Sequence, residues 1–526
     1  MGRTKLKLII NSFCKRHTVE AAYGRRLKDI ISDLGIDCSL PCGGMGRCGK
    51  CAVRFSCGAP KPNSLDMSFL TQKEIEDGYR LLCRCIVEND CEVFVDRKGT
   101  ASEEDIVAEG IEADPLSSTN DIERFGIAID IGTTTVAAAL VGKKKDKDTC
   151  FVLDSSFCVN HQRQYGADVI SRIDAASDAG VKNKLQELIR ADIRGLIEKL
   201  LGNIPGKEIT DIVLSGNATM IHLLRGYDVS GLGKYPYRVD NIGFEETDLT
   251  EVLGVNLGIC AKAHILPGIS AFVGGDIVSG LYYLNIPEDK EKALFIDLGT
   301  NGEMAYYNED TLTVTSTAAG PVFEGGGISC GVASVPGAIC HVDINDKAVE
   351  FETIGQKAPI GLCGTGVIEV VAELRRNGII SSEGLLSEEF FEKGFVLGHC
   401  SDGKTIIFTQ KDIRNVQLAK AAINTGMREL LAEDEPDVIY MAGGFGSKLA
   451  IQKIRELRLF SDDYYDKINL VGNSSLKGCV KYLEAILLGK ENSERMKITE
   501  IAKEARECVL AKEESFGEDY VAALGF

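Results

Sequence analysis

The sequence lacks several features that mark whole classes of protein. It contains no uninterrupted apolar run that approaches the ~18 residues of a membrane-spanning helix, so we expect no such helix. Its first residues, MGRTKLKL, do not show the long apolar core and small-residue cleavage site of a secretion signal. Positive charge is also scarce: 59 Lys and Arg face 78 Asp and Glu, for a formal net charge of -19. This balance argues against a nucleic-acid-binding protein.

What is present is the composition of a soluble protein with several domains. The 526 residues exceed one ordinary domain and suit about two to four. Hydrophobic residues make up 44% and charged residues 26%, the balance of a folded chain. Without a secretion signal, the 18 cysteines indicate free thiols, a metal site or catalysis rather than a disulfide framework. We therefore expect a cytoplasmic protein of a reducing, anaerobic cell.

Cysteine and charge are unevenly distributed along the chain. Nine of the 18 cysteines fall within the first 91 residues, and residues 1–98 carry a net charge of +5 against -24 for the remainder. Residues 99–124 hold eight acidic residues, one basic residue and little apolar periodicity, as in an exposed linker. We therefore predict a cysteine-rich domain, an acidic linker and two lobes of one larger unit, over residues 1–97, 98–123, 124–290 and 291–526.

A glycine-rich cysteine loop occupies residues 41–51, PCGGMGRCGKC. The spacing is Cys42-x5-Cys48-x2-Cys51, and Cys83 follows 32 residues later. Three thiolates from one tight loop and a fourth from a distant position suit a [2Fe-2S] cluster. The glycines let the backbone curl around the cluster and direct N–H groups to its sulfurs. The flanking patterns predict strands at residues 4–10, 52–55 and 92–95. They also predict a helix over residues 21–34 and a short helix that begins with a capping box at Thr71.

Other interpretations of this loop fit less well. A structural zinc site would more usually pair Cys-x2-Cys with a second Cys-x2-Cys, whereas the second group here is Cys83-x-Cys85. A redox dithiol at Cys48 and Cys51 would leave Cys42 unexplained. A phosphate-binding Walker loop would need Ser or Thr where Cys51 stands. We take Cys42, Cys48, Cys51 and Cys83 as ligands, with Cys85 as the alternative to Cys83.

Two further segments share one pattern: a buried strand, an acidic residue, a Gly-Thr turn and a second apolar strand. They are IAIDIGTTTVAAAL at 127–140 and LFIDLGTNGEMAYY at 294–307. Such a hairpin presents backbone N–H groups and hydroxyls to a phosphate, while the carboxylate faces its metal ion. One copy would be a common turn, but two copies 167 residues apart indicate two similar half-domains that face one nucleotide.

A third segment adds an adenosine site to this interpretation. The stretch DVIYMAGGFGS, which starts at Asp437, is a strand that ends in glycines, and these let the backbone pass close to an adenine and a ribose. Just before it, apolar residues at helical spacing predict a helix over residues 409–431.

The three segments resemble the ATPase fold shared by sugar kinases, actin and the heat-shock chaperones. By this resemblance Asp130 and Asp297 would hold Mg²⁺ or its water ligands near the transferred phosphate. Glu303 would orient a water molecule, although a solvent-facing position suits its strand equally well. The resemblance also implies two phosphate loops and an adenosine loop, formed by Gly132, Thr133 and Thr134, by Gly299, Thr300, Asn301 and Gly302, and by Gly443, Gly444, Phe445 and Gly446.

Residues 1–95 resemble an adrenodoxin-like ferredoxin domain, with a five-residue first spacing and a Leu-Leu-Cys motif at the fourth ligand. The fold class implied is an N-terminal β-grasp ferredoxin domain followed by a two-lobed actin-like ATPase, a mixture of α+β and α/β architecture. In this combination, over about residues 1–95 and 125–490, the chain resembles the reductive activators of corrinoid proteins.

That resemblance implies ATP-dependent transfer of one electron from a [2Fe-2S] cluster to a Co(II) corrinoid protein, which restores Co(I) for methyl transfer. The implied cofactors are the [2Fe-2S] cluster, ATP and Mg²⁺. The implied partners are a corrinoid protein of a methyltransferase system and a low-potential electron donor; a homodimer stays open, and no nucleic acid or membrane is expected. The best-known members place an additional small domain before the ATPase core. We expect it to be missing or very small here, because the first phosphate loop follows within about 30 residues of the ferredoxin domain.

Other functions stay open at the level of the sequence. An activator of another low-potential enzyme, such as a 2-hydroxyacyl-CoA dehydratase, would share the ATPase fold, but those activators lack an N-terminal [2Fe-2S] domain. A small-molecule kinase with a regulatory cluster would phosphorylate its substrate without a reductant. A redox-sensing ATP-binding module would show no ATP-dependent acceleration of electron transfer.

Overall fold

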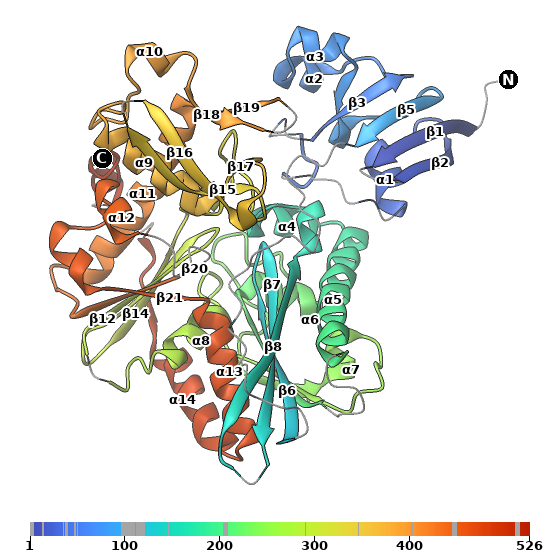
Figure 1. Cartoon of the computed structure of the whole chain (residues 1–526). Helices are drawn as coiled ribbons and strands as arrows, with labels where there is room; N and C mark the ends of the chain where they lie inside the picture. The colour runs from blue at the N-terminus through green and yellow to red at the C-terminus, as the bar shows by residue number, and fades with distance from the viewer. Residues whose placement is uncertain are drawn as a thin grey trace. The chain divides into compact units, whose positions relative to one another are not determined.

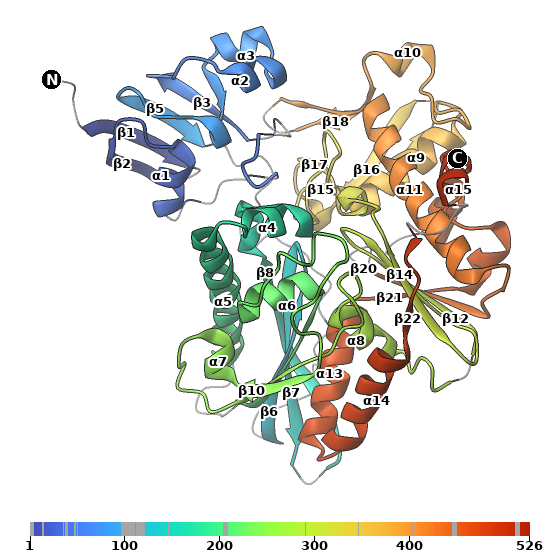
Figure 2. The same cartoon turned by 180° about the vertical axis from the view of Figure 1, so that it is seen from behind.

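The computed structural model describes most of the chain (Figure 1 and Figure 2). The described residues are 5–12, 15–34, 36, 40, 42–46, 49, 51–95, 111, 121–145, 147–202, 209–289, 291–345, 347–400, 403–443, 450–510 and 516–526. The chain forms two compact units, one of residues 1–100 with 160–189 and the other of residues 101–159 with 190–526. Among the described residues, no helix combines the length and the apolar character needed to cross a membrane.

The N-terminal part is one mixed sheet with a helix packed on it. The strand order is β2-β1-β5-β3-β4; β1 and β5 are parallel and the other neighbours are antiparallel. Helix α1 buries Leu27, Ile30 and Ile31 in one cluster with Leu8 of β1 and Val93 of β5. This is the expected β-grasp arrangement. Its elements are β1 (Lys5–Ser12), β2 (Lys15–Ala22), α1 (Leu27–Asp33), β3 (Ala52–Cys57), α2 (Ser64–Phe69), α3 (Gln72–Glu76), β4 (Tyr79–Leu81), the 3₁₀ turn η1 (Leu82–Arg84) and β5 (Cys91–Val95).

One sequence prediction in this part is wrong. Residues 21–34 were expected to be a single helix, but Lys15–Ala22 is strand β2, which pairs with β1 along its whole length. Gly24 then adopts a left-handed conformation at φ +81°, and the helix begins only at Leu27. Helix propensity in this stretch is a weak preference, and the antiparallel pairing with β1 outweighs it. The capping box at Thr71 is confirmed, because Glu74 N–H donates to Thr71 Oγ1 and Thr71 N–H donates to Glu74 Oε2.

The larger unit contains two six-stranded sheets with matching topology. The orders are β10-β11-β9-β6-β7-β8 and β21-β20-β12-β13-β14-β22. In each sheet, the three strands that come first in the chain, β6-β7-β8 or β12-β13-β14, pair antiparallel with one another. Two later strands, β9 and β11 or β20 and β21, then extend the sheet in parallel from β6 or β12. The strands are β6 (Ile122–Ile131), β7 (Thr135–Lys144), β8 (Cys150–Val159), β9 (Ile209–Gly216), β10 (Glu245–Asp248), β11 (Lys262–Ile265), β12 (Ala293–Leu298), β13 (Gly302–Tyr307), β14 (Leu312–Thr317), β20 (Val438–Gly443), β21 (Ile468–Gly472) and β22 (Arg506–Glu507). The repeat agrees with the two half-domains expected from the recurring Asp-x-Gly-Thr pattern.

Helices cover these sheets and place their own N-termini near the strand ends. Helices α8 (Gly275–Tyr283) and α13 (Ser474–Leu487) pack together, and α13 lies on β6 and β9. Helix α11 (Gln410–Leu431) lies on β13 and β14 and begins after the capping residue Thr409, as its periodicity predicted. The remaining helices are α4 (Val169–Ala175), α5 (Ala179–Leu201), α6 (Ala218–Arg225), α7 (Leu249–Leu253), α9 (Gly364–Arg376), α10 (Glu388–Phe391), α12 (Ile451–Glu456), α14 (Glu491–Glu504) and α15 (Phe516–Ala522).

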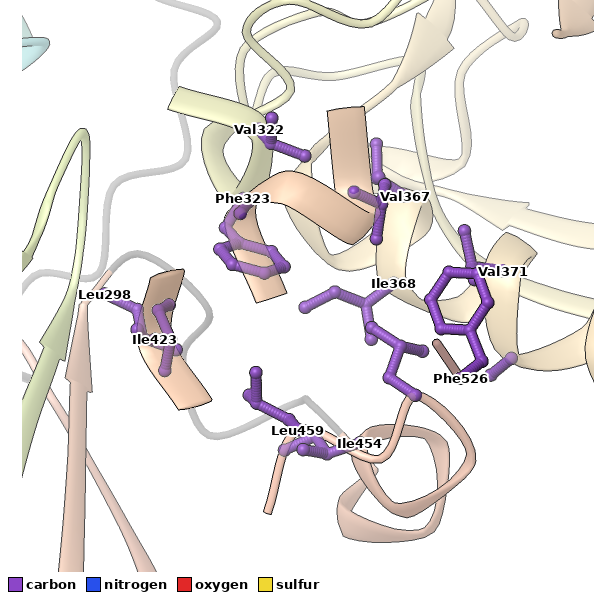
Figure 3. Close-up of a cluster of buried hydrophobic side chains, with 14 of the residues drawn as sticks. Leu298, Val322, Phe323, Val367, Ile368, Val371, Ile423, Ile454, Leu459 and Phe526 are labelled. Atoms are coloured by element: carbon purple, nitrogen blue, oxygen red, sulfur yellow. The ribbon is translucent and has the colours of Figure 1, made fainter. Parts of the chain in front are cut away.

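Two small sheets extend the second lobe and share its core. They are β16-β15-β17, formed by β15 (Ala338–Asn345), β16 (Ala348–Thr353) and β17 (Gly361–Leu362), and β18-β19, formed by β18 (Phe395–His399) and β19 (Thr405–Phe408). Figure 3 shows part of this core, where Val322 and Phe323 meet the α9 side chains Val367 and Ile368. The expected linker, residues 98–123, lies almost wholly outside the described residues, and its last two residues already belong to β6.

Candidate functional site

The expected cluster ligands come from the cysteine loop and from the turn η1. Cys51 ends the loop just before β3, and its carbonyl accepts a hydrogen bond from Leu82 N–H at 2.8 Å, which places η1 beside the loop. Arg84 fastens the same two segments, because its guanidinium donates to the Met45 carbonyl at 2.9 Å. Cys48 lies outside the described residues.

The thiols of Cys51 and Cys83 face each other. A side-chain hydrogen bond with Cys51 is the largest cause that lowers the pKa of Cys83 to about 7, and the positive charges of Arg84 and Lys28 act in the same direction. The loop approaches this pair closely, since a Cβ on Gly44 would lie 3.8 Å from Cys83 Cβ. Gly44 has φ +77°, a conformation that other residues rarely adopt. A Cys83 thiol of lowered pKa that faces Cys51 beside a curled glycine loop fits an iron–sulfur cluster.

Cys85, the alternative fourth ligand, has different surroundings. It is buried, and burial followed by the neighbouring Cys91 raises the pKa of its thiol far above the usual value. A thiol whose ionisation is suppressed is a poor metal ligand, since a ligand must be the thiolate. Of the two candidates, the structure therefore brings Cys83 and not Cys85 to the cysteine loop.

The two Asp-x-Gly-Thr segments form the hairpins β6–β7 and β12–β13. In the first hairpin, Gly132 N–H donates to the Thr135 carbonyl at 3.0 Å; in the second, Gly299 N–H donates to the Asn301 carbonyl at 2.9 Å. Asp130 and Asp297 are the next-to-last residues of β6 and β12, just before these turns. The hairpin residues expected in the phosphate loops, Gly132, Thr133, Thr134, Gly299, Thr300, Asn301 and Gly302, are all described and lie at the turns or at the first position of β13.

Carboxylates gather at these hairpins. Desolvation raises the pKa of Asp297 to about 8, with further contributions from the negative charges of Asp276, Asp130 and Glu324. Desolvation and the charge of Asp130 raise the pKa of Asp276 to about 7. The pKa of Glu303 lies well above its ordinary value for the same reasons, with Asp276 and Asp297 as its charged neighbours. A divalent cation between neighbouring carboxylates would replace their mutual repulsion by attraction, and an all-oxygen donor set is of the kind that suits Mg²⁺.

Asp130 is held in place from the start of α13. Ser475 Oγ donates to Asp130 Oδ1 at 2.7 Å, and Asn473 Nδ2 donates to Oδ2 at 3.0 Å. Asn473 also caps α13 by accepting from Leu476 N–H. Desolvation nevertheless raises the pKa of Asp130, and the two side-chain hydrogen bonds partly offset it. Glu303 stands across from Asp297 in the β12–β13 pairing, is partly buried, and accepts from Asn301 Nδ2 at 3.3 Å.

Sequence reasoning missed several residues of this site. Asp276 lies in the first turn of α8, and its signal was the Gly-Gly-Asp at the helix start. Asn217 caps α6 and donates to Thr133 Oγ1 at 3.0 Å. Glu324 accepts from hydroxyls of both phosphate loops. Each of these patterns is a common turn or cap, and only its place in the fold makes it informative.

The expected adenosine loop is described only at its first residue. Gly443 ends β20 at φ +114°, and a Cβ there would lie 2.3 Å from the Leu298 carbonyl oxygen, so only glycine suits this position. Gly444, Phe445 and Gly446 lie outside the described residues.

A further group of potential metal ligands lies elsewhere in the larger unit. Single ligand atoms of Glu246, His264 and Glu491 lie within 4.8 Å of one another. Both carboxylate oxygens of Glu246 already bind cationic side chains, those of Lys262 and Arg495. Protein cations thus neutralise the Glu246 carboxylate of this group.

Three family models match almost the whole chain. Residues 11–88 match the 2Fe-2S iron-sulfur cluster binding domain, residues 125–289 the RACo middle region, and residues 291–526 the C-terminal domain of RACo, the ASKHA domain. The first two ranges contain the cysteine loop and the first phosphate hairpin, and the third contains the second hairpin.

Individual relatives point the same way. The chain is 34% identical over 391 residues to the corrinoid activation enzyme RamQ of Eubacterium limosum, which covers 68% of this chain and 64% of that protein. It is 26% identical over 439 residues to the [Co(II) methylated amine-specific corrinoid protein] reductase of Methanosarcina barkeri, with 76% and 77% covered. A solved structure of a reductive activator for corrinoid, iron-sulfur protein matches 99% of this chain and 98% of that chain, at 29% identity and a TM-score of 0.68.

The comparisons confirm the fold class, a ferredoxin domain followed by an actin-like ATPase core. The first phosphate hairpin lies within the stretch that matches the RACo middle region. The expectation of a missing or very small extra domain stays a prediction.

Proposed function

Because this chain belongs to the RACo family, we propose that it is an ATP-dependent reductive activator, which returns the cobalt of a corrinoid protein from Co(II) to Co(I). One observation carries the proposal. A single chain joins an iron–sulfur-type cysteine loop to a two-lobed nucleotide fold in which carboxylates converge at two phosphate hairpins. The printed names of the relatives, a corrinoid activation enzyme and a corrinoid protein reductase, supply the substrate class.

Cys42, Cys48, Cys51 and Cys83 would hold a [2Fe-2S] cluster. When bound, such a cluster supplies a one-electron donor. The chain's own part is to present the thiols and to set their environment. Arg84 ties η1 to the loop through the Met45 carbonyl, and its charge favours the thiolate form of Cys83. The basic surplus of residues 1–98 suits an acidic partner, such as a low-potential electron donor protein.

The larger unit would bind ATP between its two hairpins. Backbone N–H groups and hydroxyls of Thr133, Thr134 and Thr300 would bind the phosphates, and Gly443 to Gly446 would pass along the adenosine. Asp130 and Asp297 would hold Mg²⁺ or its water ligands, which neutralise phosphate charge. Glu303, beside Asp297, would orient the attacking water.

Nucleotide chemistry is needed because reduction of cobalt to Co(I) is unfavourable for an ordinary iron–sulfur donor. Each 59 mV of mismatch in a one-electron step costs about a factor of ten in the equilibrium constant, or about 1.4 kcal/mol. A gap of a few hundred millivolts therefore costs several kcal/mol, within the range of a nucleotide-driven conformational change. Different affinities of the ATP and ADP states for the corrinoid protein would supply this energy. A homodimer is compatible with this scheme.

The proposal is tested with anaerobically purified full-length protein. Visible and EPR spectra report a [2Fe-2S] centre, and the absorbance of a Co(II) corrinoid protein, mixed with reductant and with or without ATP, reports Co(I). We expect ATP to accelerate Co(I) formation in the wild type and in Cys57→Ala, a control outside the cysteine loop, and Cys42→Ala to abolish it. Absence of the spectroscopic centre, or Co(I) formation that ignores both ATP and Cys42→Ala, would refute the proposal.

A further inference from the structure

One carboxylate links the two phosphate hairpins. Glu324 Oε2 accepts a hydrogen bond from Thr134 Oγ1 at 3.0 Å and another from Thr300 Oγ1 at 3.1 Å. Thr134 belongs to the β6–β7 hairpin of the first lobe and Thr300 to the β12–β13 hairpin of the second. The other oxygen, Oε1, would lie 3.5 Å from a Cβ on Gly299. A single anionic group thus engages donors of both loops.

These donors are the ones that a nucleotide phosphate requires. Hydroxyls and N–H groups at the hairpins bind an anion because they supply positive dipole ends without bulk. Each hydroxyl has one proton to donate, so the same Thr134 and Thr300 protons cannot serve Glu324 and a phosphate oxygen at once. Glu324 is also one of the charges that raise the pKa of Asp297, so it stands among acids that repel it. The two hydroxyl donors compensate that repulsion.

The backbone that carries Glu324 is firmly held. Glu324 is the last residue of the 3₁₀ turn η5 (Pro321–Glu324), which packs against α9 and α11. The side chains of Val322 and Phe323 are buried in the core of the second lobe, as Figure 3 shows. A Cβ on Gly364, the first residue of α9, would lie only 1.7 Å from the Phe323 carbonyl oxygen, so the turn and the helix start are in close contact. An exchange of partners at Glu324 must therefore come from its side chain.

We propose that the Glu324 carboxylate competes with a phosphate of ATP for the hydroxyls of Thr134 and Thr300, so that ATP displaces this side chain when it binds. This inference rests on the proposed function, since it assumes that ATP binds between the hairpins. It assigns to Glu324 a gating role that is distinct from the metal-binding and water-orienting roles of the other carboxylates.

The test measures ATP affinity, which needs no corrinoid protein. The full-length protein is titrated with Mg·ATP by calorimetry as wild type, Glu324→Gln, Glu324→Asp and the control Glu350→Gln, which removes the same charge from the exposed strand β16. A neutral acceptor binds the two hydroxyls less strongly than a carboxylate, so we expect Glu324→Gln to bind ATP about fivefold to tenfold more tightly than wild type. Glu324→Asp, which keeps the charge but loses reach, should fall between them, and Glu350→Gln should match wild type.

The direction of the change separates this role from others. If Glu324 oriented water, bound the metal or had a purely structural role, its substitution would leave ATP affinity unchanged or weaken it. Unchanged or weaker ATP binding by either Glu324 variant would therefore overturn the inference. Circular dichroism of each variant confirms that it is folded, and the Michaelis constant for ATP hydrolysis should fall together with the dissociation constant. A wild-type chain that binds no ATP would refute the proposed function as well. Failure to reduce cobalt, with tighter ATP binding by Glu324→Gln, would refute the proposed function alone.

Discussion

The hydrogen bond from Ser475 to Asp130 gives the sharpest test of the nucleotide site. Ser475 is buried, and its Oγ donates to Asp130 Oδ1 at 2.7 Å, so Ser475→Ala leaves a desolvated carboxylate with one donor fewer. A hydrogen bond to a charged group contributes about 1.5–3 kcal/mol. If Asp130 acts only when it is ionised and correctly placed, this energy corresponds to a loss of about 10- to 140-fold in kcat/KM for ATP hydrolysis.

The loss should depend on pH. Ser475 is the first of the two side-chain hydrogen bonds that lower the pKa of Asp130 against the effect of desolvation, so its removal raises that pKa further. Protonated Asp130 cannot hold a metal ion, and the deficit of Ser475→Ala should therefore grow as the pH falls. Steady-state ATPase assays between pH 6 and pH 9, with excess Mg²⁺, measure this profile.

The neighbouring residue provides a matched control. Ser474 is equally buried, and its Oγ has no hydrogen-bond partner within the described part of the chain, so Ser474→Ala removes the same atom without removing a contact. We expect Ser474→Ala to stay within about twofold of the wild type. Equal activity of Ser475→Ala and wild type, or equal losses in both variants, would refute the reasoning that places Asp130 at the metal.

Three further predictions concern pH, the cluster and the first phosphate loop. Folding raises the pKa of Asp276 from 3.8 to about 7 and that of Asp297 from 3.8 to about 8, so the folded state holds more protons than the unfolded state across that pH window. The metal-free protein should therefore lose stability as the pH rises from about 4 to about 8. Mg²⁺ should raise the melting temperature more at pH 8 than at pH 5, and a pH-independent Mg²⁺ effect would contradict this prediction. Cys83→Ala should abolish the [2Fe-2S] visible and EPR spectra while Cys85→Ala retains them, and the opposite pattern would make Cys85 the ligand. Asn217→Ala removes a helix cap and a donor to the first phosphate loop, so it should lower the free energy of unfolding by about 0.5–2 kcal/mol and raise the KM for ATP. Asn217→Asp can still cap the helix. It should therefore raise the KM for ATP with little loss of stability in denaturant titrations.

Much of the fold could be predicted because its signals are local. A buried strand followed by Asp, Gly and Thr and by a second strand predicts a hairpin from neighbouring residues alone, and both hairpins formed as expected. The same holds for the capping box at Thr71 and for the helix that begins after Thr409. The expected helix over residues 21–34 was wrong because its first part depends on a partner strand, and local propensity carries no information about that partner.

Only part of the candidate site could be predicted from local sequence. Asp130 and Asp297 could be named from their hairpins, but Asp276 and Ser475 come from helix starts and Glu324 from the end of a turn elsewhere in the chain. Their local sequences, Gly-Gly-Asp, Asn-Ser-Ser and Phe-Glu-Gly, resemble ordinary caps and turns. The role of Cys48 and of Gly444 to Gly446 stays a prediction, since these residues lie outside the described part of the chain.

The sequence by itself determined which chemistry the chain can perform: the spacing of the cysteines and the repeated acid–glycine–threonine hairpins restrict it to iron–sulfur and nucleotide binding. Only the tertiary structure decided which groups act together. Whether Cys83 or Cys85 faces the cysteine loop, and which carboxylates share one charged site, depends on the packing of η1 beside the loop and of α8 and α13 together. The pKa of Asp297 likewise depends on acids far away in the chain, because electrostatic energy follows distance in space and not separation in sequence.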